Sequence, residues 1–278
     1  MFAHVEVYAR KRTATKRSVH EVLSEARRDP GACSHVDNPQ PPLVIKGCGI
    51  DEVERIHDAL ASAGVEWTSK GVARRLRSDT PTLLAAVFSH PSPMEEIGRD
   101  PATGLKVKEW VRDTIAWAKS DLESRGGQFL SAIFHADEAY PHLHVYAVHA
   151  AGRVDVLHPG RQAKRETVAR ALEAGATKQQ ANRTGNNSYR QTMRMWQDRY
   201  WKEVGSKHAL DRKGPKRRRL SRQEWAEARA DATLLAERIR DAEQLRLEAQ
   251  KQLQILDEVA KSIGVDLRSR LKDAQEAR

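Results

Sequence analysis

The sequence predicts an α+β fold in which a central antiparallel sheet with flanking helices is followed by a long C-terminal helix. Short apolar segments of strand length alternate with amphipathic helical segments over the first part of the chain. Two of the expected strands are separated by only six residues, which favours a hairpin. Beyond residue 160 the pattern becomes helical, polar and highly charged, so this part is expected to be extended and solvated.

The N-terminal part begins with a strand at residues 2–8, where apolar and polar side chains alternate. A short helix is expected from about 18 to 28, and it contains His20. Two proline-bearing segments within 29–42 cannot continue that helix. They predict an ordered or semi-rigid loop, in which His35 lies.

The next elements complete the expected sheet and its helices. Residues 51–63 form an amphipathic helix, and 83–89 form a continuous apolar run of strand length. An apolar stripe at helical spacing predicts a helix over 104–125, closed by two glycines. Strands at 129–135 and 142–150 then form the hairpin.

The C-terminal part has a different character. An aromatic-rich helix is expected over 188–204, and a strongly basic stretch follows it. From Leu235 onward apolar or small residues recur at heptad positions, which is typical of a coiled coil and makes a homodimer a candidate state. A single helix packed on its own domain fits the pattern equally well. We therefore expect a catalytic-type domain at 1–206, a basic linker at 207–230 and a C-terminal helix at 231–278.

Composition narrows the functional classes. The 278 residues include 48 Lys and Arg against 38 Asp and Glu, a net charge of +10 that favours a polyanionic partner such as nucleic acid. Cys33 and Cys48 have neither the number nor the spacing of a disulfide framework or a cysteine zinc site. No signal-like or membrane-spanning apolar run occurs, so we expect a soluble protein of the reducing cytoplasm.

Three histidines carry the strongest chemical signal. His142 and His144 lie two apart on an expected strand, so their imidazoles project from the same face. His135 ends the partner strand, and the hairpin brings it across from them. Three neutral imidazoles on rigid strands leave coordination positions open for water or a phosphate oxygen, as a catalytic metal requires. Ordinary strand histidines are the alternative, and the joint spacing disfavours it.

The segment HADEAYPHLH, residues 135–144, resembles the HxDExxPHxH signature of the MobV (Mob/Pre) relaxases, plasmid mobilisation proteins of the HUH endonuclease superfamily. The resemblance covers about residues 1–225, with specificity concentrated in the ten-residue motif. It implies an HUH relaxase or nuclease domain that holds Mn²⁺ or Mg²⁺ on its sheet. It also implies nicking of one strand of single-stranded or hairpin plasmid origin DNA, through a covalent bond between the protein and the DNA 5′ phosphate.

The same resemblance implies a histidine nucleophile activated by the glutamate of the motif, which is Glu138 here. His20 is the nearest match in position, and His35 in the loop is a close competitor. Most other HUH enzymes use a tyrosine. Three tyrosines are candidates for that alternative: Tyr140, Tyr189 and Tyr200.

The basic stretch is expected to contact DNA phosphates, because Lys and Arg displace condensed counterions whatever the base sequence. Its members are Lys207, Arg212, Lys213, Lys216, Arg217, Arg218, Arg219 and Arg222. A weaker candidate is the polar segment 183–194, with Arg183, Asn186, Asn187 and Arg190.

Other functions fit the same residues. A rolling-circle replication initiator or a transposase would use the metal with a tyrosine nucleophile. A DNA-binding module without activity would hold a structural metal through its histidines. A zinc hydrolase would use a bound hydroxide and leave no covalent adduct.

Overall fold

The computed structural model describes residues 2–68, 70–212 and 222–262. The chain divides into two compact units, Met1–Pro215 and Lys216–Arg278. Within the described residues, no helix is long and apolar enough to span a membrane.

A five-stranded antiparallel sheet is the centre of the first unit, with strands in the order β1-β5-β7-β6-β2. The strands are β1 (Phe2–Ala9), β2 (Leu43–Gly47), β5 (Pro81–Ser89), β6 (Gly127–His135) and β7 (His142–His149). A separate hairpin consists of β3 (Val65–Trp67) and β4 (Ala73–Arg75). The predicted α+β class with a central antiparallel sheet is therefore confirmed.

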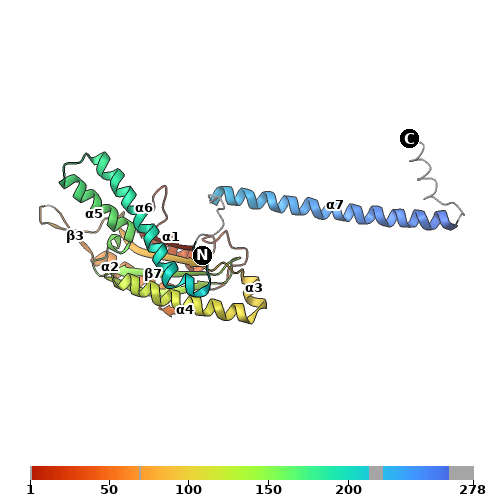
Figure 1. The fold of residues 1–278 in the computed structure, drawn as a ribbon, viewed down its shortest axis with the longest axis horizontal. Helices are drawn as coiled ribbons and strands as arrows, with labels where there is room; N and C mark the ends of the chain where they lie inside the picture. Colours follow the sequence, from red (N-terminus) through yellow and green to blue (C-terminus); the bar gives the residue numbers. More distant parts are fainter. Residues whose placement is uncertain (1, 69, 213–221, 263–278) are drawn as a thin grey trace. The chain divides into compact units, whose positions relative to one another are not determined.

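Helices surround this sheet, and one long helix lies in the second unit (Figure 1). Those of the first unit are α1 (Val19–Arg27), α2 (Ile50–Ala63), α3 (Met94–Arg99), α4 (Pro101–Glu123), α5 (Pro159–Glu173) and α6 (Lys178–Glu203). Two short 3-10 turns, Asp155–Leu157 and Gly205–His208, complete it. The second unit contains α7 (Arg222–Ser262).

The two faces of the sheet bury different apolar clusters, because successive strand residues point to opposite sides. Tyr146 and Ile133 belong to the cluster that includes residues of α1 and α2. Leu143 and Val145 belong to the other cluster, which includes residues of α4 and α6. Residues of β7 that are two apart therefore share one environment. His142 and His144 accordingly lie on the α1 and α2 side, in line with Tyr146.

Helix α1 delivers an arginine to this same side. It begins with a capping box in which Ser18 and Glu21 satisfy each other's backbone N–H groups. It ends at Arg28, whose φ of 65° is in the left-handed region that reverses the chain after a helix. The side chain of Arg28 is only 4% exposed, so the helix end directs a guanidinium into the protein.

Some boundaries differ from those expected. The first unit extends beyond residue 206, because His208 contacts Asp113 at 3.0 Å and Leu210 is buried in the core. Helix α7 begins at Arg222, before the expected residue 231. The seam of α7 contains exposed Leu253 and Leu256, and its pairing stays a prediction.

Candidate metal centre

The three histidines lie on one face at one end of the β6–β7 hairpin. His135 of β6 is directly opposite His142 of β7, and Ile133 is opposite His144. Directly opposed residues of an antiparallel pair point to the same side of the sheet. The ring centroids of His135 and His144 are 4.7 Å apart. The hairpin thus brings the sequence-predicted residues together on the α1 and α2 side.

His135 is held by the backbone of α1. Its Nε2 lies 3.0 Å from the carbonyl oxygen of Ala26, and a carbonyl only accepts, so Nε2 must carry the proton. Burial, together with the nearby positive charge of Arg28, lowers the pKa of His135 to about 4. The ring is therefore neutral at pH 7, and Nδ1 keeps its lone pair. That buried Nδ1 has no hydrogen-bond partner among the described residues.

His142 has partners on both ring nitrogens. Its Nδ1 is 2.5 Å from the Ser89 hydroxyl on β5, and its Nε2 is 3.1 Å from Glu138 Oε2. His144 has a weaker contact, 3.4 Å from Nδ1 to the Tyr146 hydroxyl. Burial and the neighbouring His135 and His142 keep the pKa of His144 well below its ordinary value. His144 is therefore also neutral at pH 7.

The donor set fits a divalent metal in its chemistry. His135 offers a buried lone pair beside His144, and its other nitrogen donates to a backbone carbonyl, as is usual for histidines that ligate metals. Across the part of the chain that the structure describes, no three His, Cys, Asp or Glu side chains are already grouped around a common point. His142 instead directs Nε2 toward Glu138.

A buried ion-pair cluster joins the motif to α1 and to the proline-rich loop. Arg28 donates to both oxygens of Asp137, at 2.8 and 2.6 Å, and to Glu138 at 2.9 Å. The Asp137 side chain is 1% exposed and also accepts from the backbone N–H of Gln40. Burial alone would raise the pKa of Glu138, but His142 and Arg28 outweigh it and lower the pKa to about 2.

Sequence reasoning missed Arg28, Asp137 and Ser89 as parts of the site. One signal was present, because paired arginines end the helix before the loop while the motif holds adjacent acids. These opposite charges lie at two chain reversals, so an ion pair between the arginines and the acids could have been predicted. Nothing in the sequence linked Ser89 to His142, since that contact depends on the β5–β7 register.

The two candidate histidine nucleophiles lie in different places. His35 Nε2 is 3.9 Å from Glu138 Oε1 and 3.6 Å from Glu25 Oε1, in the loop that Asp137 fixes. His20 lies on the outer side of α1, with its side chain 75% exposed and Nδ1 3.1 Å from Glu54 of α2. Glu138 therefore contacts both His142 and His35, and no contact given for the described residues joins it to His20.

The three candidate tyrosines also lie in different places. Tyr200 is fully buried in the core, where its hydroxyl is 3.0 Å from both Trp110 Nε1 and Thr114 Oγ1, and burial raises its pKa to about 12. Tyr189 stacks on His158 and lines a groove beside β1. Tyr140 lies in the β6–β7 turn and is 44% exposed. Of the three, Tyr140 is the one within the motif.

The basic stretch is only partly described. Lys207 is exposed in the turn after α6, whereas Arg212 pairs with Asp198 at 2.6 Å. Lys213 and the residues Lys216, Arg217, Arg218 and Arg219 lie outside the described residues. Arg222 is the first residue of α7. The exposed polar residues of the other expected segment lie on α6: Arg183, Asn186, Asn187 and Arg190.

Comparisons with known proteins add little to this geometry. No protein-family model matches the chain, and no curated protein matches it. Among solved structures, a conjugative relaxase, TrwC, in complex with oriT DNA in a copper-bound form, aligns with it. The alignment covers 76% of this chain and 100% of that chain, with 12% sequence identity and a TM-score of 0.27. The function therefore rests on the residues of the site.

Proposed function

We propose that this protein is a metal-dependent endonuclease and strand transferase that nicks one strand of single-stranded or hairpin plasmid origin DNA, as a relaxase of the kind that the motif at 135–144 resembles. The observation that carries the proposal is the state of His135. Its ring is neutral, its Nε2–H is held by Ala26, and its buried Nδ1 lone pair lies beside His144. A histidine that ligates a metal has this state: one ring nitrogen donates to a hydrogen-bond partner and the other keeps its lone pair for the metal.

His135, His142 and His144 would hold the metal, Mn²⁺ or Mg²⁺, with His142 exchanging its contact to Glu138 for the ion. When bound, the ion supplies Lewis-acid stabilisation of the charge that develops on the scissile phosphate. Ser89 keeps Nδ1 of His142 engaged, which leaves Nε2 as the nitrogen that faces the site. The two neighbouring strands thereby fix the orientation of the ring.

His35 and Glu138 are the residues that would carry the covalent step. Nε2 of His35 lies 3.6 Å from Glu25 and 3.9 Å from Glu138, and with a small movement the Glu138 carboxylate would take the proton from Nε2 while Nδ1 attacks phosphorus. The P–N bond forms as the bond from phosphorus to the 3′ oxygen breaks, and that oxygen leaves as a hydroxyl after taking the proton that Glu138 accepted. Attack by a free 3′ hydroxyl reverses the step and rejoins the strand.

The proposal is tested by covalent capture. The protein is incubated with Mn²⁺ and a randomised pool of single-stranded oligonucleotides, and DNA that stays attached after denaturation is recovered and sequenced. We expect one enriched cleavage sequence with the wild-type chain. We expect that it is lost with His135→Ala, His142→Ala or His144→Ala and kept with His149→Ala, a control at the far end of the same strand. Equal recovery from all the variants would contradict the proposal.

The adduct also separates the remaining candidates. A phosphotyrosine adduct would favour the initiator or transposase chemistry, with exposed Tyr140 as the nucleophile. Metal-dependent cleavage that releases a free 5′ phosphate without any adduct would indicate a hydrolase. Metal binding without cleavage would leave a DNA-binding module with a structural metal.

A further inference from the structure

A polar cavity that none of the three histidines lines lies beside Glu6 of the edge strand β1. We name it the edge groove. It has a volume of about 750 Å³ and lies between the N-terminal part of the sheet and the helical pair α5–α6. Strand β1 is at one end of the sheet order, with β5 between it and the histidine-bearing β7. At roughly 4.8 Å for each strand spacing, the groove begins about 10 Å across the sheet from the site.

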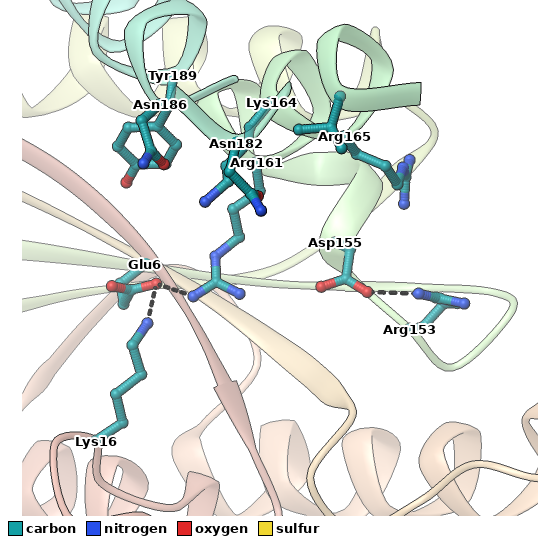
Figure 2. Close-up of a pocket in the computed structure, with 11 residues that line it drawn as sticks. Glu6, Lys16, Arg153, Asp155, Arg161, Lys164, Arg165, Asn182, Asn186 and Tyr189 are labelled. Atoms are coloured by element: carbon teal, nitrogen blue, oxygen red, sulfur yellow. Dashed lines mark hydrogen bonds and ion pairs between the residues drawn. The ribbon is translucent and has the colours of Figure 1, made fainter. Parts of the chain in front are cut away.

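Positive charge dominates the lining of the edge groove. Five basic side chains face two acidic ones, Glu6 and Asp155, an excess of three positive charges. Lys16 and Arg161 share Glu6, at 2.7 and 3.2 Å, and Figure 2 shows them reaching it from opposite sides. Arg153 pairs with Asp155 at 2.7 Å. Within the described residues, no ion pair involves the two remaining basic side chains, Lys164 and Arg165.

The helical wall of the groove is tightly interlocked. A side chain at Gly185 of α6 would lie 2.6 Å from Val168 on α5, and one at Gly160 would lie 2.8 Å from the Tyr189 ring. The two helices can approach so closely only because these positions lack a Cβ. The basic residues of α5 and the amides of Asn182 and Asn186 on α6 consequently line the same groove (Figure 2).

We propose that the edge groove binds the sugar-phosphate backbone of a single-stranded nucleic acid. Lys164 and Arg165 provide positive charge that no ion pair within the described part of the chain neutralises, which suits phosphodiester oxygens. The Asn amides can donate to phosphate or base edges, and Tyr189 adds an aromatic ring for sugar or base contacts. The volume is within the range of small-molecule pockets, so a few nucleotide groups can enter the groove.

The proposal rests on the proposed function only in making this strand the one that is nicked.

Glu6 should have a definite effect on the affinity of the groove for nucleic acid. Its carboxylate occupies Lys16 and Arg161, so a phosphate must compete with it for those two cations. Removal of the Glu6 charge should therefore strengthen binding, whereas removal of Lys164 and Arg165 should weaken it. Simple structural damage would not produce effects of opposite sign.

The experiment measures binding of a fluorescent single-stranded oligonucleotide to the full chain by anisotropy, with EDTA present and over a range of salt concentrations. The test variants are Lys164→Gln/Arg165→Gln and Glu6→Gln. The matched control is Lys178→Gln/Arg170→Gln, which removes the same charge from exposed positions of α6 and α5 outside the groove. Because no metal is present, binding is separated from nicking, and absence of nicking would not affect the result.

We expect the Lys164/Arg165 variant to bind the oligonucleotide several-fold more weakly. The slope of log affinity against log salt concentration should be less steep by about 1.4, because two phosphate contacts are lost at roughly 0.7 each. Glu6→Gln should bind more tightly than wild type, and the control should keep the wild-type slope. The proposal is overturned if the groove variant and the control change equally. It is also overturned if a deoxynucleoside monophosphate competes as well as the oligonucleotide, since the groove would then be a nucleotide pocket.

Discussion

At the scale of single residues, the site depends on histidines that are oriented by groups outside the motif. Ala26 holds His135 and Ser89 holds His142, and neither partner could be inferred from the motif itself. The sequence was sufficient for the three histidines, because two-residue spacing on a strand and a short hairpin determine which side chains share a face. It was insufficient for the choice of nucleophile, which depends on the path of the loop around His35.

The nucleophile gives the first residue-level prediction. We expect His35→Ala to abolish the covalent DNA adduct, because His35 is the candidate that faces Glu138. His20→Ala, which removes an exposed side chain paired with Glu54, should leave the adduct within about twofold of wild type. The readout is the yield of denaturation-resistant protein–DNA adduct. Loss of adduct in the His20 variant alone would reverse the assignment.

The cluster around Arg28 gives a stability prediction. Arg28→Gln would leave the 1% exposed carboxylate of Asp137 without its cation, and breaking a buried pair on one side typically costs about 3–5 kcal/mol. The exposed pair of Arg77 and Asp79 provides the control, because Arg77→Gln should cost less than about 1 kcal/mol. Urea unfolding of the two variants checks this difference. Equal losses would mean that the buried cluster contributes no more than a surface pair.

At the scale of secondary-structure elements, the strands that the sequence predicted are those that bury side chains on one or both faces. Strands β1, β5, β6 and β7 have this property. Strand β2 has five exposed residues, so it lacks an alternation of buried and exposed positions and was missed. Its position depends on pairing with β6, a long-range contact that local pattern does not contain. Helix α5 lies in the part that was expected to be helical, but its bounds were not predicted, since Gly160 is its one buried residue.

Helix α4 gives the prediction at this scale. Asp100 caps its N-terminus by accepting from the backbone N–H groups of Ala102 and Thr103 at 3.1 and 3.0 Å. Asp100→Ala should lower the free energy of unfolding, whereas Asp100→Asn, which keeps a capping oxygen, should lower it much less. Chemical denaturation distinguishes them. Identical values for the Ala and Asn variants would argue against a capping role.

At the scale of the whole molecule, the chain consists of a compact unit that contains the site and a second unit with one long helix. We propose that the basic stretch from Lys207 to Arg222, which spans the boundary of the two units, binds DNA and that α7 pairs with a second copy. A chain ending at Pro215 should then keep its thermal unfolding transition and its nicking activity. It should lose DNA affinity and salt dependence, with the slope reduced by roughly 0.7 for each phosphate contact removed.

The same truncation tests the pairing of α7. Sedimentation of the full chain should show a mass that rises with concentration toward a dimer, and the truncated chain should sediment as a monomer at every concentration. A monomeric full chain would identify α7 as a single helix. Dimerisation that persists after truncation would place the contact in the first unit instead.

The histidine site is proposed to form a covalent bond to DNA through His35, and the sharpest test is to locate that bond in the protein. The adduct formed with Mn²⁺ is digested with trypsin, and the peptide that carries the nucleotide is identified by mass spectrometry. Cleavage after Arg28 and Lys46 places His35 in the peptide 29–46, while His20 falls in 18–27. We predict an acid-labile phosphohistidine on the peptide 29–46. A phosphotyrosine, or cleaved DNA that carries no peptide, would contradict the account.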